Sequence, residues 1–259
     1  MLLVLDIGNT HTHVGLAHAQ RVRRRIDTMT DGWFSGGAAR RIRELVGQQT
    51  LEGMALCSVV PRATPAANQL AIQFGLECLE LNSRTISGVG INYPKPRTIG
   101  PDRLANAVAV KHHYGAPAVV IDFGTAVTFD VVDRKGDYVG GIIAPGLASM
   151  TNYLHEKTAL LPRIKIRDVQ AVIGKNTKEA MLIGAVHGYR GLISGLLAEL
   201  KAVLACRRLP VVDTGGYARL IAAKVPEITA VEPLLTLEGL RLVWANKHGE
   251  PARFRRRGD

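Results

Sequence analysis

The sequence predicts an α/β protein built from two similar halves, because one motif occurs twice along the chain. Each copy is an apolar run typical of a buried strand, followed by Asp, by Gly two residues later and by a second strand-like run. The two carboxylates are Asp6 and Asp122, 116 positions apart in a chain of 259 residues. A repeat at nearly half the chain length indicates two domains, which we expect at residues 1–115 and 116–259.

The first half alternates between strand and helix patterns after a three-strand meander. Strands are expected at 2–6, 12–17, 22–28, 53–60 and 76–81, and helices at 34–48, 64–75 and 104–114. Pro61 ends the fourth strand, and Pro101 suits the first turn of the last helix. Residues 88–96 are rich in turn formers, so we expect them to be irregular. The order β-β-β-α-β-α-β is that of a ribonuclease H-like domain.

The second half repeats the meander. Strands are expected at 117–122, 126–132, 137–143 and 210–213, and helices at 147–157, 176–206, 217–224 and 236–246. The chain is therefore expected to be an α/β protein of the actin-like ATPase class. Its two duplicated ribonuclease H-like domains would have the nucleotide cleft between them.

The composition indicates a soluble, cytoplasmic protein with no membrane partner. Hydrophobic residues make up 47% of the chain, which is enough for a packed core. No uninterrupted apolar run approaches the ~20 residues of a membrane helix, and the first residues lack the basic region of a signal peptide. Cys57, Cys78 and Cys206 are odd in number and widely spaced, which argues against a disulfide framework or a zinc site.

Much of the net charge of +11 comes from two arginine clusters, within residues 21–25 and 253–257. Such clusters either bind nucleic acid or remain solvated. Aromatic residues are only 5% of the chain, so base-stacking platforms would be sparse, and no zinc finger or similar motif occurs. We expect no nucleic-acid partner, since an anionic substrate such as a nucleotide explains a basic surface equally well.

Four glycine-rich turns follow expected strands, at 6–10, 122–125, 140–146 and 214–216. Glycine lets backbone N–H groups approach phosphate oxygens, and an Asp carboxylate can hold the accompanying cation or its waters. Asp-x-Gly is also common in ordinary hairpins, so a purely structural role is the alternative. No P-loop, nucleophile elbow or protein-kinase motif occurs. The turns predict a duplicated phosphate clamp of the kind found in sugar kinases and actin.

Five motifs, taken in order, resemble those of the type III pantothenate kinases. They are Asp6-x-Gly8-Asn9-Thr10, Tyr93 with Gly100-Pro101-Asp102-Arg103, Asp122-Phe123-Gly124-Thr125-Ala126, Gly140-Gly141 with Pro145-Gly146, and Thr214-Gly215-Gly216. The match runs from residue 2 to about residue 245. The resemblance implies transfer of the ATP γ-phosphate to the hydroxyl of pantothenate, which gives 4′-phosphopantothenate in the first step of coenzyme A biosynthesis.

The resemblance also implies roles for individual residues on the nucleotide side. ATP would be bound by Asp6, Ile7, Gly8, Asn9, Thr10, His11, Thr12, His13, Thr125 and Gly215. Asp6 would hold Mg²⁺ directly or through water, and Asp122 would hold a monovalent cation, K⁺ or NH₄⁺. His13 departs from the small or apolar residue that members of the family often carry at this position.

On the acceptor side, the resemblance makes Asp102 the catalytic base. Pantothenate contacts are assigned to Tyr93, Gly100, Pro101, Asp102, Arg103 and Thr177, the last from the partner subunit of a homodimer. Structural explanations stand beside these roles, since Asp102 is favourable at a helix N-terminus, Tyr93 could anchor a loop and Thr177 could be an N-cap. Pro101 replaces the small or β-branched residue expected there.

Two other functions remain open. A non-catalytic member of the family could act as a basic accessory factor in gene expression, and a related kinase could phosphorylate a sugar or a short acid. The presence of Asp102, Arg103 and the phosphate-turn glycines favours catalysis. The segment from Tyr93 to Arg103 favours pantothenate as the acceptor.

Overall fold

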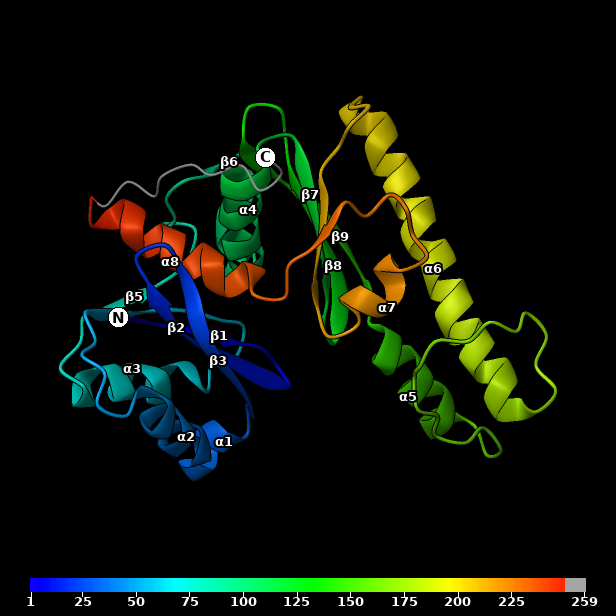
Figure 1. Cartoon of the computed structure of the whole chain (residues 1–259), viewed down its shortest axis with the longest axis horizontal. Helices are drawn as coiled ribbons and strands as arrows, with labels where there is room; N and C mark the ends of the chain where they lie inside the picture. Colours follow the sequence, from blue (N-terminus) through cyan, green and yellow to red (C-terminus); the bar gives the residue numbers. More distant parts are fainter. Residues whose placement is uncertain (250–259) are drawn as a thin grey trace. The chain divides into compact units, whose positions relative to one another are not determined.

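The computed structural model describes residues 1–249, and the arginine cluster at 253–257 lies outside them (Figure 1). The chain divides into two compact units. Within the described residues, unit 1 comprises Met1–Gly115, Gly136–Val139 and residues 234–249, and unit 2 comprises Ala116–Lys135 and Gly140–Pro233. The expected boundary at residue 115 coincides with the first switch between the units. The expected second domain differs from unit 2, because the last helix groups with unit 1.

Unit 1 contains a five-stranded sheet in the order β3-β2-β1-β4-β5. Its strands are β1 (Leu2–Ile7), β2 (His11–His18), β3 (Arg21–Met29), β4 (Gly53–Ser58) and β5 (Cys78–Glu80). β1 is antiparallel to β2 and parallel to β4. Both faces of β1 are covered, which explains why its first residues are all apolar and buried. The arginines of residues 21–25 lie on the edge strand β3, where charge discourages pairing with another chain.

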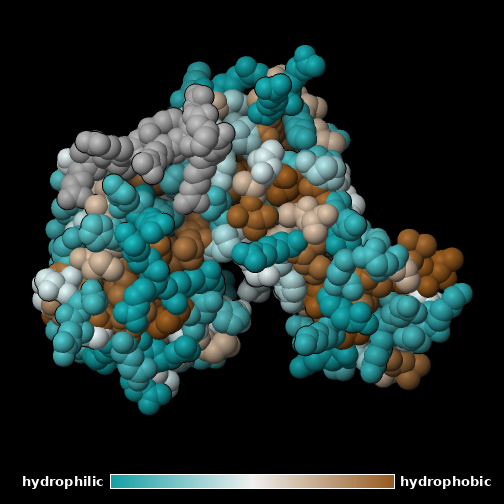
Figure 2. Space-filling model, viewed as in Figure 1, coloured by the Kyte–Doolittle hydropathy of each residue, from teal (hydrophilic) through white to brown (hydrophobic). Residues whose placement is uncertain are grey.

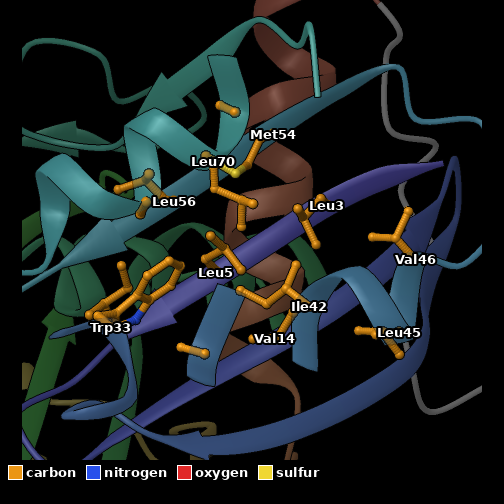
Figure 3. Packing of buried hydrophobic residues seen from close by; sticks show 14 of the residues in the cluster. Leu3, Leu5, Val14, Trp33, Ile42, Leu45, Val46, Met54, Leu56 and Leu70 are labelled. Atoms are coloured by element: carbon orange, nitrogen blue, oxygen red, sulfur yellow. The ribbon is translucent and has the colours of Figure 1, made fainter. Parts of the chain in front are cut away.

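Helices α2 (Gly37–Val46) and α3 (Thr64–Gln73) cover one face of this sheet. Their apolar side chains pack on those of the strands, and the labelled members of the cluster are Leu3, Leu5, Val14, Trp33, Ile42, Leu45, Val46, Met54, Leu56 and Leu70 (Figure 3). The single helix expected at 34–48 is instead two, α1 (Gly32–Ser35) and α2. Gly36 separates them because its φ of +77° is left-handed.

Helix α8 (Leu235–Lys247) packs against the opposite face of the same sheet and against α4 (Pro101–Tyr114). Small residues at Gly15, Gly53 and Ala55 make room for it on the strands. A Cβ at Gly53 would overlap the Trp244 ring, and a Cβ at Gly15 would lie 3.2 Å from Leu237. This face of the sheet is therefore shaped for α8, which explains why the helix belongs to unit 1.

A buried ion pair also joins α8 to the turn between β2 and β3. Arg241 Nε lies 2.8 Å from Glu238 Oε2, and both side chains are less than a tenth exposed. Arg241 Nη1 donates to the carbonyl of Ala19 at 2.8 Å, and the N–H of Val22 donates to Glu238 Oε1 at 2.6 Å. Each charge thus satisfies a backbone group of the turn, as buried charges require.

Unit 2 repeats this strand order as β9-β8-β7-β10-β11. Its elements are β7 (Ala118–Phe123), β8 (Ala126–Val132), β9 (Asp137–Pro145), α5 (Leu147–Lys157), α6 (Thr177–Leu204), β10 (Val211–Gly215), α7 (Ala218–Ala222) and β11 (Ala230–Val231). β7 is antiparallel to β8 and parallel to β10, as β1 is to β2 and β4. This equivalence confirms the predicted duplication. The first residues of β9 belong to unit 1, where Asp137 and Tyr138 pair with β6 (Gly90–Ile91).

The strands that the sequence did not predict are β6 and β11, each of two residues. The turn-rich segment 88–96, which was expected to be irregular, contains β6, and a short 3₁₀ helix at Pro96–Thr98 begins at its last residue. A pair of residues has no periodicity, so such strands become visible only when their partners are in place.

Helix α6 is 28 residues long and, by length and composition alone, apolar enough to cross a membrane. One such helix is weak evidence, since the core helix of a soluble protein passes the same test. Arg190 lies in the middle of α6 and is 7% exposed. Its Nη2 lies 2.9 Å from Asp168 Oδ1 and donates to the carbonyl of Leu220 at 2.8 Å. The middle of α6 therefore packs against other segments of unit 2.

Candidate active site

The turn between β1 and β2 is the first expected phosphate-binding segment. Asp6 is the next-to-last residue of β1, and Asn9 and Thr10 are exposed at the tip of the turn. The N–H of Gly8 donates to the carbonyl of His11 at 3.0 Å, and a Cβ at Gly8 would lie 3.0 Å from that oxygen. The turn is therefore tight, and it presents exposed polar groups that can meet a ligand.

Thr30, which follows β3, stabilises this turn through two hydrogen bonds. Its hydroxyl donates to the carbonyl of Gly8 at 2.6 Å, and its N–H donates to the carbonyl of Thr10 at 3.0 Å. The buried hydroxyl of Thr12 lies 3.1 Å from Thr30 Oγ1 and accepts from Trp33 Nε1 at 3.0 Å. Sequence reasoning missed Thr30 and Trp33, because no local pattern marks them before β3 pairs with β2.

Replacing Thr30 with Val should weaken the binding of Mg·ATP by about tenfold and the folded state by about 1–3 kcal/mol. Val keeps the shape, but it removes the donor to the Gly8 carbonyl and one of the two hydrogen-bond partners of the Thr12 hydroxyl, which keeps its bond with Trp33 Nε1. Calorimetric titration and thermal unfolding would measure both effects. Thr28→Val is the control, since Thr28 lies two residues earlier on β3 and is buried like Thr30. Unchanged nucleotide affinity in Thr30→Val would contradict the role of Thr30.

The remaining residues of this segment divide between core and surface. The side chains of Ile7 and Thr12 are 0% exposed. His11 and His13 lie on one face of β2 with stacked rings 6.4 Å apart between centroids. Burial lowers the pKa of His13, although its hydrogen bond with Asp27 opposes this shift. His13 is therefore neutral at pH 7, and its side chain is available for contacts that those of Ile7 and Thr12 cannot make.

Unit 2 has an equivalent turn between β7 and β8. Asp122 is again the next-to-last residue of its strand, and the N–H of Gly124 donates across the turn to the carbonyl two residues later at 3.1 Å. The side chain of Thr125 is exposed, while its carbonyl accepts from the N–H of Gly146 at 3.1 Å and from the Ser149 hydroxyl at 2.7 Å. A Cβ at Gly146 would overlap the turn, so glycine is needed where α5 begins.

The end of β10 brings Gly215 beside this turn. Thr214 and Gly215 pair with Asp122 and Phe123 of β7. Gly215 has a φ of +88°, and a Cβ there would lie 2.7 Å from the backbone of Phe123. Only glycine fits this position without strain. The structure thus brings together Asp122, Gly215 and the Thr125 turn within unit 2.

Asp213 is a buried carboxyl that sequence reasoning did not single out. Neither of its side-chain oxygens has a hydrogen-bond partner in the described part of the chain. Burial raises the pKa of Asp213 to about 9, and the charge of Asp122 adds to the shift. Because Asp213 pairs with Ile121 rather than with Asp122, it projects from the other face of the sheet. At neutral pH it is protonated and leaves Asp122 as the local negative charge.

Oxygen atoms suited to cations are present, although among residues 1–249 no group of three or more His, Cys, Asp or Glu side chains is arranged to hold a metal ion by itself. Thr128 and Thr214 lie directly opposite Asp122 on the two neighbouring strands. One carboxylate is therefore flanked by two hydroxyl groups on the same face, a set of hard oxygen ligands. These residues fit a monovalent cation. The carboxylate of Asp6 fits Mg²⁺, which usually keeps several of its waters.

The first turn of α4 carries Asp102 and Arg103, after Gly100 as N-cap and Pro101 as first helical residue. The N–H of Arg103 donates to Asp102 Oδ1 at 2.9 Å, and a Cβ at Gly100 would lie 2.5 Å from that oxygen. Burial raises the pKa of Asp102, and the hydrogen bond and charge of Arg103 only partly oppose it. A carboxylate with a raised pKa is a better proton acceptor near neutral pH.

Tyr138 supports both Arg103 and Tyr93 within unit 1. The guanidinium carbon of Arg103 lies 5.8 Å from the centre of the Tyr138 ring, and the Tyr93 and Tyr138 rings meet edge to face at 6.2 Å. Tyr138 is 1% exposed. Sequence reasoning missed it, since an aromatic residue in a strand pattern is usually core. The buried Tyr138 ring thus contacts both Tyr93 and Arg103, and the first turn of α4 places Asp102 next to Arg103.

Thr177 is the first residue of α6 and is exposed in unit 2. Asn176 caps the helix, because its Oδ1 accepts from the N–H of Glu179 at 3.0 Å. The N-cap explanation for Thr177 is therefore wrong. Its hydroxyl remains available for a ligand or a partner.

Comparison with known proteins identifies the family. A family model described as type III pantothenate kinase matches residues 2–199. A type III pantothenate kinase of Akkermansia muciniphila is 45% identical over 240 residues, which cover 93% of this chain and 96% of that protein. Among solved structures, a Baf family protein from Campylobacter jejuni has a TM-score of 0.62 at 16% identity, covering 95% of this chain and 98% of that one.

The fold extends to proteins outside this group. Component A of the (R)-2-hydroxyglutaryl-CoA dehydratase of Acidaminococcus fermentans has a TM-score of 0.55 at 14% identity, covering 95% of this chain and 98% of that one. This likeness concerns the fold alone, and it agrees with the two equivalent sheets of an actin-like ATPase fold. The family match covers more than half of the sequence. The chain therefore belongs to the type III pantothenate kinase family.

Proposed function

We propose that this protein transfers the γ-phosphate of ATP to the hydroxyl of pantothenate. The product is 4′-phosphopantothenate, in the first step of coenzyme A biosynthesis. The observation that carries the proposal is the first turn of α4, where Asp102 is followed by Arg103. The guanidinium of Arg103 lies over the Tyr138 ring, which also contacts Tyr93. Asp102 supplies a proton acceptor, and Arg103 supplies a guanidinium that contacts the Tyr138 ring. Together they suit a substrate that carries both a hydroxyl and a carboxylate.

Asp102 acts as the base. Phosphoryl transfer depends mainly on positioning and on neutralising charge, so the proton of the attacking hydroxyl is needed late and one carboxylate suffices. Burial raises the pKa of Asp102 and makes its carboxylate a stronger acceptor. Gly100 leaves the space in which the Asp102 oxygen lies.

Arg103 binds the carboxylate or amide oxygens of pantothenate. A guanidinium presents a planar fork of donors, and its position over the Tyr138 ring gives this charge a cation–π contact. Tyr93, Gly100 and Pro101 complete the contacts on this side. A neutral acceptor would make little use of such a group, which favours pantothenate over a simple sugar.

ATP is bound by residues 6–13 of unit 1 and by Thr125 and Gly215 of unit 2. The exposed side chains of Asn9, Thr10 and His11 are the phosphate contacts in the first turn. Ile7 and Thr12 contribute through their backbone, because their side chains are buried. The glycines of both turns let backbone groups approach phosphate oxygens.

The proposal includes two cations, one in each unit. Mg²⁺ bound with ATP would neutralise phosphate charge, and Asp6 would hold it directly or through water. Asp122, with Thr128 and Thr214 beside it, would hold K⁺ or NH₄⁺. Both assignments use oxygen ligands on the strand ends that carry the turns.

The protein is proposed to be a cytoplasmic homodimer, in which Thr177 contacts pantothenate bound mainly by the partner subunit. Support comes from unit 2, where large apolar side chains are exposed on α5 and on the segment before α6. They are Tyr153, Leu160, Val172 and Ile173. Figure 2 shows hydrophobic side chains gathered over the segment between α5 and α6. A second copy would cover this surface. Neither a membrane nor nucleic acid is part of the proposal.

The test is an ADP-release assay on purified protein with ATP, Mg²⁺ and K⁺, with and without pantothenate. ADP release that depends on pantothenate, and that falls when Na⁺ replaces K⁺, is the expected result. Binding of ATP without pantothenate-dependent turnover in either salt would contradict the proposal. It would favour another small acceptor or a non-catalytic role in gene expression, and assays with a panel of sugars and short acids would separate these two.

A further inference from the structure

Four side chains of unit 1 form a polar row across the sheet, near the end of β1. Cys57 of β4, Asp6 of β1, His13 of β2 and Asp27 of β3 occupy matching positions on neighbouring strands. Residues directly opposite each other project from the same face of a sheet. Cys57 Sγ donates to Asp6 Oδ1 at 3.4 Å at one end of the row. His13 is therefore the neighbour of the carboxylate proposed for Mg²⁺.

Arg25 holds Asp27 in a fixed orientation at the other end of the row. Arg25 Nε donates to Asp27 Oδ1 at 2.7 Å, and Arg25 Nη2 donates to Asp27 Oδ2 at 2.9 Å. This two-pronged contact fixes the plane of the carboxylate. Arg25 Nη2 also lies 3.2 Å from His13 Nδ1, so the three side chains form one compact group.

The contact between Asp27 and His13 fixes the tautomer of the imidazole. Asp27 Oδ1 lies 2.7 Å from His13 Nδ1. An ionised carboxylate can only accept hydrogen bonds, so Nδ1 carries a proton and donates it to Asp27. The lone pair of the neutral ring is then on Nε2, at the edge of the ring away from Asp27. Since Asp27 is on β3 and Asp6 is on β1, this edge lies on the side of β2 where Asp6 is found.

We propose that Asp27 and Arg25 are positioning residues that hold His13 so that its Nε2 accepts a hydrogen bond from a water molecule on the Mg²⁺ of Mg·ATP. Mg²⁺ sheds its waters reluctantly, and these waters need acceptors beyond the direct ligands. Partners of this kind typically change metal affinity by about 10–100-fold. The inference rests on the proposed function of Asp6. It adds Arg25 and Asp27 to the nucleotide side and gives His13 a specific role there.

A purely structural role for the group makes a different prediction. Exposed ion pairs contribute little to stability. If the Arg25–Asp27 pair were only a surface ion pair of β3, its removal would not affect nucleotide binding. The distinguishing measurement is the affinity for ATP with and without Mg²⁺. It is made by calorimetric titration of the whole chain in the absence of pantothenate.

Asp27→Asn should weaken the binding of Mg·ATP by about tenfold or more and leave the binding of ATP in EDTA unchanged. An amide can donate to Nδ1, so the imidazole is no longer held in the tautomer that leaves Nε2 as acceptor. Asp31→Asn is the matched control, since it makes the same change in charge at an exposed residue without a side-chain cap bond. Arg25→Gln should show a smaller loss, and Arg24→Gln on the same strand should show none.

Two substitutions of His13 test which ring nitrogen matters. Gln places its amide near the position of Nε2, whereas Asn places it near the position of Nδ1. His13→Gln should therefore retain part of the affinity for Mg·ATP, and His13→Asn should lose it. Equal affinities in these two variants would overturn the assignment of Nε2.

The remaining outcomes are also decisive. Unchanged Mg·ATP affinity in Asp27→Asn overturns the proposal. Equal weakening with and without Mg²⁺, or a lowered Tm that accounts for the loss, shows a structural role and overturns it as well. The expected pattern in a protein that does not phosphorylate pantothenate supports the positioning group while contradicting the proposed acceptor. Absence of Mg·ATP binding by the unsubstituted protein overturns both.

Discussion

Replacing Asp102 with Asn is expected to lower kcat by about 10²–10⁴-fold while leaving the KM for ATP nearly unchanged. Asn keeps the size of the side chain and an oxygen that can accept from the N–H of Arg103, a bond of 2.9 Å in the structure. The first turn of α4 should therefore persist. What the variant loses is the capacity to take the hydroxyl proton. The ADP-release assay at saturating substrates measures this loss, and a variant as active as the parent would remove Asp102 as the base.

The same substitution is expected to stabilise the fold at neutral pH. Burial raises the pKa of Asp102, so the folded state holds this proton to a higher pH than the unfolded chain does. The stability associated with this group is full below the unfolded pKa and is lost as the pH rises through the folded pKa. At pH 7 the ionised carboxylate is therefore unfavourable in the folded state. Asp102→Asn should raise the Tm while it lowers kcat, and a lowered Tm would indicate a damaged helix turn.

The pH dependence of turnover gives an independent check on Asp102. Protonation removes the base, so kcat should fall on the acid side at a pH above the ordinary range of an aspartate. The residual activity of Asp102→Asn should lack this fall. Glu44→Gln on α2 makes the same change from carboxylate to amide at an exposed residue and should alter neither kcat nor its pH profile. Persistence of the acid limb in Asp102→Asn would assign it to another group.

Replacing Arg103 with Gln is expected to raise the KM for pantothenate by about 10–100-fold, with little change in the KM for ATP. Hydrogen bonds to charged groups contribute about 1.5–3 kcal/mol each, and Gln can replace neither the charge nor the fork. Arg103→Lys should recover only part of the loss, because an ammonium group lacks the planar stacking surface that meets Tyr138. Arg97→Gln, an exposed residue of the same segment, is the control.

Pantothenol, in which an alcohol replaces the carboxylate, identifies the group that Arg103 contacts. If the guanidinium binds the carboxylate, the parent protein should use pantothenol poorly and Arg103→Gln should lose little more. An equal loss with both substrates would assign Arg103 to the amide oxygens instead. Unchanged KM values for both substrates in Arg103→Gln would remove it from the acceptor site.

Most elements could be predicted from sequence because their signals are local. The buried strands at the start of each half, and the helix at 147–157, were expected within a residue or so of where they occur. The five motifs also identified the family. The break at Gly36 was not predicted, and the N-cap of α6 could not be assigned to a single residue. Backbone angle decides the first and hydrogen bonding the second, and several residues at each place were suitable.

The parts of the candidate site that could not be predicted depend on residues far apart in sequence. Tyr138 reaches Arg103 only because β9 pairs with β6, a strand of two residues without periodicity. Asp27 reaches His13 only because of the register between β2 and β3, in which a shift of one residue would turn the side chains to opposite faces. A motif search finds the residues proposed to bind ligands, but it does not find the residues that hold them in place.

The sequence by itself determined the two-fold repeat, the order of strands and helices and the family, because apolar periodicity and turn glycines act over a few residues. Only the tertiary structure decided that α8 belongs with the first sheet, where its buried Glu238 and Arg241 satisfy the backbone of the β2–β3 turn. It also decided which polar groups hold Asp102, Arg103 and His13. Burial and register follow from packing between distant segments, and no local pattern encodes them.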